Sequence, residues 1–129
     1  MHGPPAYGAQ KAGIDKMAAD MAVDFRGTGG VACVSIWMGI LLTERFRAAF
    51  DGHPEALAKT AAHAETPEFT GHLIDALYRD PDLADLSGHT LIGAELAQRY
   101  GITDEDGRRP PSHREMLGEP REPSAVVIR

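Results

Sequence analysis

The stretch GTGGVACVSIW, residues 27–37, decides the fold class of this chain. Its glycines end a long amphipathic helix predicted over residues 5–26, because glycine is the residue most often found just beyond a helix. The residues at 31–37 are apolar and β-rich, which is typical of a strand buried on both faces of a parallel sheet. Helix, glycine turn and buried strand form half of an α/β unit, so the sequence predicts an α/β fold.

Length and charge limit the classes of protein to which the chain can belong. Its 129 residues suffice for one domain, and its formal net charge is −6. An acidic chain is a poor match for nucleic acid or an anionic membrane, so neither is expected as a partner. The sequence has no apolar run of membrane-spanning length and no signal-peptide pattern, which predicts a cytoplasmic protein. The single cysteine, Cys33, suits a buried apolar position, and the scattered histidines predict no metal site.

Two side chains suited to proton transfer, Tyr7 and Lys11, stand at the start of the predicted first helix. Residues four apart stack on one face of an α-helix. A nearby ammonium favours the phenolate and lowers the pKa of a tyrosine from its usual value of about 10. The pair is therefore a candidate general acid/base, and a half-exposed aromatic beside a solvated charge is the alternative. Lys11 falls on the apolar stripe of the helix, where it must snorkel or have a partner, whereas Asp15 is assigned to the polar side.

The middle of the chain is predicted to be helical in pieces. Residues 44–64 form helical segments broken at Gly52 and Pro54. Thr66 followed by Pro67 is a clear helix start, and that helix continues to about residue 79.

The last third of the chain contains a second predicted strand. A short helical turn at 81–88, a strand at 89–93 and a helix at 94–100 capped by Gly101 follow one another. The charged, proline-containing residues 104–129 are predicted to form a mostly irregular tail that either lies along the body or is disordered. The predicted domain therefore spans residues 1–103.

Several motifs in order resemble the short-chain dehydrogenase/reductase family. They are Y-x-x-x-K on a helix (Tyr7 to Lys11), the buried strand at 31–37, and G-x-x-x-T after it (Gly39 to Thr43). The segments SGHTLIG and ELAQRYGITDEDGR, at 87–93 and 95–108, resemble the ending of one subgroup of that family. The resemblance covers about residues 5–110. It implies the C-terminal half of a Rossmann-like, doubly wound parallel sheet, helix-rich as it stands.

The resemblance also implies a reaction. Members of the family are NAD(P)-dependent oxidoreductases that interconvert a carbonyl and an alcohol, so a small carbonyl or alcohol is the expected substrate. Tyr7 would be the general acid/base, and Lys11 would lower the pKa of Tyr7 and bind the nicotinamide ribose.

The expected cofactor is NAD or NADP, and this chain would hold the nicotinamide end of that cofactor. By resemblance, the backbone of Met38, Gly39 and Ile40 would hold the ring, and Thr43 would bond the carboxamide or phosphate side. Thr43 is equally in position to cap the helix that follows it. Met38 stands where the family usually has proline, which predicts a looser loop and weaker ordering of the cofactor.

Residues 44–80 correspond by resemblance to the variable substrate lid of the family. Their apolar side chains suit an apolar substrate and ordinary packing equally well. These side chains are Phe46, Phe50, Leu57, Phe69 and Leu73.

The family's glycine-rich phosphate turn and catalytic serine have no counterpart in this sequence. The strand at 31–37 would then present an unpaired edge, and exposure of apolar surface would cost on the order of 10 kcal/mol. We therefore expect a marginally stable chain that is a homo-oligomer or depends on a partner.

Three interpretations remain open. The first is an enzyme whose other half lies elsewhere, and the second is a non-catalytic remnant or oligomerisation module derived from that family. The third is an unrelated helical protein with one chance strand, which far-UV circular dichroism showing no sheet would favour.

Overall fold

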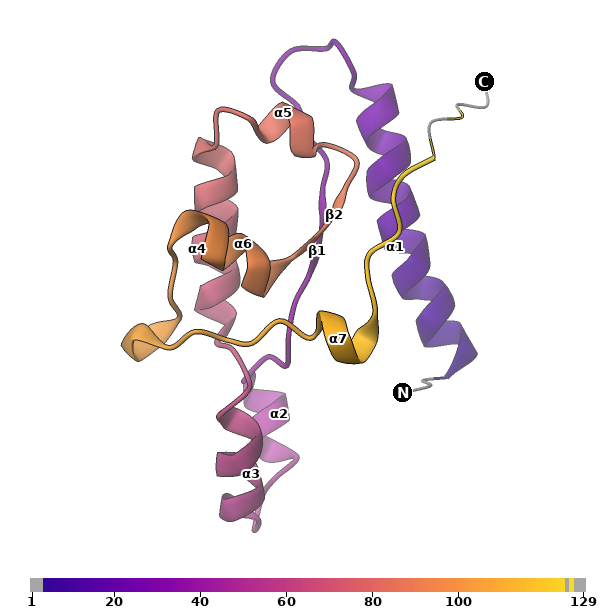
Figure 1. Ribbon diagram of the computed structural model, residues 1–129. Coiled ribbons are helices and arrows are strands. Elements are labelled where there is room, and N and C mark those ends of the chain that lie inside the picture. The colour runs from indigo at the N-terminus through magenta and orange to yellow at the C-terminus, as the bar shows by residue number, and fades with distance from the viewer. Residues whose placement is uncertain (1–3, 125, 127–129) are drawn as a thin grey trace.

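The computed structural model describes residues 4–124 and residue 126, and its centre is a small parallel sheet. Strand β1 (Ser35–Trp37) pairs with β2 (Thr90–Ile92) in parallel, with Ser35 opposite Thr90 and Trp37 opposite Ile92. Helix α1 (Pro5–Asp24) lies on one side of the strands, and α4 (Pro67–Arg79) and α6 (Gly93–Tyr100) lie on the other (Figure 1). Helices flanking a parallel pair of strands confirm the predicted α/β class.

Both predicted strands are present, although each is shorter than the sequence suggested. The backbone of Cys33 does not enter the ladder, because its N–H donates to the Ser87 hydroxyl at 3.0 Å and its C=O accepts from the Gly88 N–H at 2.7 Å. Cys33 is half-buried. One edge of β1 is thus paired with β2, and within the described residues no strand lies along the other edge.

The core lies between α4 and α6, and it corrects part of the predicted lid. Phe69 and Leu73 are completely buried, and they pack with Leu77 of α4 and with Leu96 of α6. Helix α4 begins where the sequence predicted, since the Thr66 hydroxyl accepts the N–H of Phe69 at 3.2 Å. Phe69 and Leu73 are therefore packing residues and not substrate contacts.

Helices α2 (Glu44–Ala48) and α3 (Pro54–Ala61) extend away from this body (Figure 1). Neither helix has a buried residue. Phe46 and Phe50 contact each other, with ring centroids 5.1 Å apart. Within the predicted lid, residues 44–80, α2 and α3 are the helices that have the exposed position expected of a lid.

The chain exposes far more surface than a compact protein of its size. Its accessible surface is 9381 Å², whereas a folded monomer of 13.9 kDa exposes roughly 6,700 Å². Helix α1 contributes to the excess, because Ala18 is its one buried residue. A chain that buries so little surface has a small hydrophobic contribution to its stability.

The last described part of the chain returns across the strands. It contains the short helices η1 (Glu105–Gly107) and α7 (Arg114–Leu117), whereas the short helix α5 (Leu83–Leu86) lies earlier in the chain, between α4 and β2. Asp104, where the predicted tail begins, is buried and forms an ion pair with Arg108 at 2.9 Å. Residues 104–124 are mostly irregular outside η1 and α7, and they lie along the body (Figure 1). A search of the described helices finds none with the length and apolarity needed to cross a membrane.

Candidate active site

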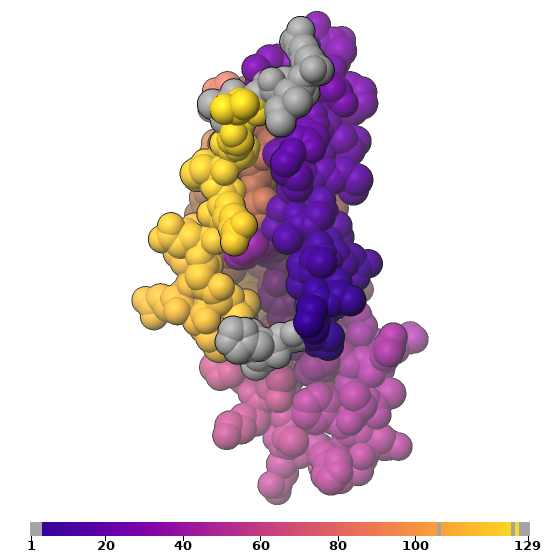
Figure 2. Space-filling view, turned by 90° about the vertical axis from the view of Figure 1, so that its right-hand side faces the viewer, coloured from indigo at the N-terminus to yellow at the C-terminus, as the bar shows by residue number. Residues whose placement is uncertain are grey.

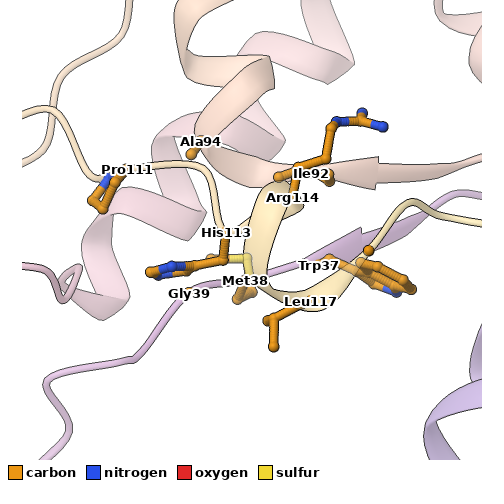
Figure 3. Close-up of a pocket in the computed structure, with 10 residues that line it drawn as sticks. Trp37, Met38, Gly39, Ile92, Ala94, Pro111, His113, Arg114 and Leu117 are labelled. Atoms are coloured by element: carbon orange, nitrogen blue, oxygen red, sulfur yellow. The ribbon is translucent and has the colours of Figure 1, made fainter. Parts of the chain in front are cut away.

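A hollow opens where the carboxyl ends of the two strands meet. Trp37 and Ile92 end β1 and β2 and line it together with Met38 and Gly39, while the opposite wall comes from residues 110–118, here called the C-terminal segment (Figure 3). The hollow has a volume of about 330 Å³, including space open to solvent. Open α/β sheets bind their ligands outside the carboxyl ends of the strands. This hollow is therefore the candidate site.

The candidate catalytic pair lies on α1, which faces the C-terminal part of the chain across a groove (Figure 2). Tyr7 is in the first turn of α1 and is 57% exposed. The Nζ of Lys11 is 5.6 Å from the centroid of the Tyr7 ring, which is a cation–π contact. The structure thus brings the two residues together, and Lys11 is itself exposed to solvent. Neither residue lines the hollow.

Met38 and Gly39 are the predicted cofactor residues that do line the hollow, and neighbouring side chains hold both. The Thr70 hydroxyl contacts the Met38 sulfur at 3.6 Å. The Gly39 N–H donates to Oε1 of Glu65 at 2.9 Å. The first contact holds the Met38 side chain, and the second holds the backbone of Gly39.

Ile40 and Thr43 lie outside the lining of the hollow. Ile40 is exposed, and its C=O accepts the N–H of Glu65 at 2.8 Å. Thr43 caps α2, because its hydroxyl accepts the N–H of Phe46 at 3.1 Å. Thr43 therefore has a structural role, and its cofactor role stays a prediction.

Asp15 belongs to the strand side of α1, and its assignment to the polar side was wrong. Its Oδ1 accepts the Ser35 hydroxyl at 2.6 Å, and both of its carboxylate oxygens lie 3.1 Å from Nε1 of Trp37. Asp15 thus joins α1 to β1 one helical turn beyond Lys11. Asp15 follows Lys11 by four residues, and this spacing was the sequence signal that could have placed both side chains on the same face.

One carboxylate fastens the C-terminal segment over the hollow. Glu95 of α6 accepts two hydrogen bonds from Arg114, at 2.8 and 2.6 Å, and a third from the Ser112 hydroxyl at 2.8 Å. The hydrogen bonds from Arg114 lower the pKa of Glu95 to about 2. His113, between these two donors, has a buried Nε2 without a hydrogen-bond partner in the described structure. No sequence pattern indicated this network, because α6 and the C-terminal segment are separate in the chain.

The contact between Glu95 and Arg114 predicts how the segment responds to acid. The folded-state pKa of Glu95 is below its ordinary value of 4.5, so its stabilising effect is complete above that value and is lost as the pH falls through about 2. Following the Glu95 carboxyl carbon by NMR during acid titration should give a midpoint near 2. In Arg114→Met, the midpoint should return toward 4.5. A midpoint near 4.5 in the unsubstituted chain contradicts the contact.

The polar side chains of the site do not form a metal centre in the part of the chain that the structure describes. No group of three His, Cys, Asp or Glu side chains gathers there in a way that could hold an ion.

Comparison with known proteins places this geometry in a family. No family model matches the chain. Dehydrogenase/reductase SDR family member 1 from Homo sapiens is 40% identical over 109 residues, which are 79% of this chain and 34% of that protein. The protein of the same name from Mus musculus is 41% identical over the same shares. The chain spans about a third of the length of these relatives. The matched region and its parallel α/β unit show that the chain belongs to the short-chain dehydrogenase/reductase family, in the subgroup of these relatives.

Proposed function

We propose that this chain carries the proton-transfer and nicotinamide-side residues of an NAD(P)-dependent oxidoreductase that interconverts a carbonyl and an alcohol. The observation that carries the proposal is the hollow at the carboxyl ends of β1 and β2, lined by Met38 and Gly39. Helix α1, with Tyr7 and Lys11, forms the other wall of the adjoining groove (Figure 2). In this proposal the fold is the C-terminal half of a Rossmann-like sheet.

The described residues fit the nicotinamide end of the cofactor. Trp37, Met38 and Ile92 give the hollow an apolar lining suited to a flat ring, and Gly39 brings backbone close to it. The Thr43 hydroxyl accepts one hydrogen bond as a helix cap and can still donate its own proton. When bound, the cofactor supplies or accepts a hydride.

Tyr7 is proposed as the proton donor to a carbonyl oxygen, and as the proton acceptor in the reverse direction. Its exposure leaves the phenol open to a substrate. Lys11 places a positive charge beside the phenol, with its Nζ 5.6 Å from the ring centroid. Lys11 is further proposed to bind the nicotinamide ribose. Asp15 is proposed to hold this part of α1 against β1.

The test of this function is an assay of the purified chain with NADH and NADPH against a panel of aldehydes and ketones. Loss of reduced-nicotinamide absorbance that depends on both enzyme and carbonyl supports the proposal. A control with Lys11→Met should show little turnover, because it removes the charge beside Tyr7. Equal rates for that variant and the original chain would contradict the assigned roles.

A second candidate function, a non-catalytic interaction module, is favoured by the exposed apolar side chains of α1. Five large side chains of this helix and its C-cap are between 37% and 57% exposed: Tyr7, Ile14, Met17, Met21 and Phe25. In this case the chain should form a complex of fixed ratio with a full-length member of the family. Tyr7→Phe should leave that complex intact while abolishing any turnover, which separates the two functions.

A further inference from the structure

Glu65 makes three hydrogen bonds to the segment from Gly39 to Leu42, which includes proposed cofactor residues. Its Oε1 accepts the Gly39 N–H at 2.9 Å. Its backbone N–H donates to Ile40 C=O at 2.8 Å, and its C=O accepts the Leu42 N–H at 2.9 Å. Both the side chain and the backbone of one residue therefore hold this loop.

The position of Glu65 is stabilised by the hydrogen bonds of its neighbour, Thr66. Thr66 donates its N–H to Asp104 at 3.0 Å and its hydroxyl to the same carboxylate at 2.5 Å. Asp104 in turn is paired with Arg108. Thr66 also caps α4, whose first turn packs Phe69 into the core. The loop is thus connected through Glu65 and Thr66 to helix α4 and the buried core.

The contact between Glu65 and Gly39 leaves little room for a larger residue at position 39. Glu65 is 1% exposed. A Cβ atom on Gly39 would lie 3.0 Å from Oε2 of Glu65 and 3.6 Å from Nε2 of His113. Glycine at position 39 therefore lets the buried carboxyl approach the backbone.

We infer that Glu65 is a positioning residue that fixes the Gly39–Leu42 loop for the nicotinamide end of the cofactor. The inference rests on the proposed function. Proline would fix one backbone angle at position 38, whereas Glu65 fixes three backbone groups after it. Met38 is thereby tolerated in a loop that must present one defined surface to a ligand.

The first test measures amide hydrogen exchange in the chain without cofactor. The quantity compared is the exchange rate of the Gly39 amide divided by that of the Leu73 amide in the core. Glu65→Leu removes the side-chain acceptor, so the ratio should rise about tenfold or more. Glu65→Gln keeps an acceptor oxygen and should leave the ratio near its original value. Leu77→Ala destabilises the core away from the loop and should speed both amides without raising the ratio.

The second test measures energy transfer from Trp37 to NADH. The initial slope of transfer against NADH concentration should fall about tenfold in Glu65→Leu and change little in Glu65→Gln. An unchanged exchange ratio in Glu65→Leu overturns the inference, and so does an unchanged slope. If the original chain shows no transfer at all, the proposed function fails, and the exchange ratio still decides whether Glu65 holds the loop.

Discussion

Replacing Tyr7 with phenylalanine is expected to lower carbonyl turnover by about two to four orders of magnitude. The substitution removes the hydroxyl that is proposed to exchange a proton with a substrate oxygen, while it keeps the ring beneath Lys11. Because Tyr7 is 57% exposed and makes few contacts, the fold should be unchanged. The measurement is the initial rate with saturating NADH or NADPH in a preparation that shows turnover.

Tyr78 supplies the matched control for this substitution. It is 81% exposed on α4, so Tyr78→Phe removes an equivalent hydroxyl away from the groove. That variant should keep its full rate. Activity of Tyr7→Phe within about threefold of the original chain would show that Tyr7 is not the general acid/base.

The largest expected effect on stability is that of Phe69→Ala. Phe69 is fully buried between α4 and α6, and removal of a buried phenylalanine side chain costs about 3 to 5 kcal/mol. Whole domains have stabilities of only about 5 to 15 kcal/mol, and this chain buries unusually little surface. The variant should therefore be largely unfolded near room temperature, as measured by circular dichroism and urea titration.

Tyr78→Ala is the control for the loss of an aromatic side chain from the same helix. Its exposed position predicts a change within about 0.5 kcal/mol. A cooperative unfolding transition of Phe69→Ala at the same urea concentration as the original chain contradicts the assigned core. The excess surface also predicts that the unsubstituted chain self-associates or melts at low temperature, which sedimentation and thermal unfolding test.

The parts of the fold that local sequence determines were predicted well. Thr66 and Pro67 start α4, and Gly101 ends α6 with a φ of +67°, a conformation that glycine adopts without strain. The two strands were also found, because apolar β-branched runs are visible without knowledge of the partner. The two paired strands and the identity to the relatives exclude the interpretation as an unrelated helical protein with one chance strand.

The parts that were missed depend on residues far apart in the sequence. Glu65 contacts Gly39 across 26 positions, and Arg114 contacts Glu95 across 19. An isolated carboxylate gives no local signal of either partner. Phe69 was assigned to the lid and the core with equal weight, since burial depends on what α4 packs against. The domain boundary at residue 103 and the cofactor roles of Met38, Gly39, Ile40 and Thr43 stay predictions.

The most direct test of the central claim, that this chain holds the nicotinamide end of a cofactor site, uses Trp37. It is the only tryptophan and lines the hollow beside Met38 and Gly39. The chain is titrated with NADH, with NADPH and with reduced nicotinamide mononucleotide, and energy transfer from Trp37 is corrected with a free tryptophan derivative. Because the proposed site holds the nicotinamide end and the sequence has no glycine-rich turn, all three should give saturable transfer, the mononucleotide included. If none of the three nucleotides gives saturable transfer, the claim is contradicted.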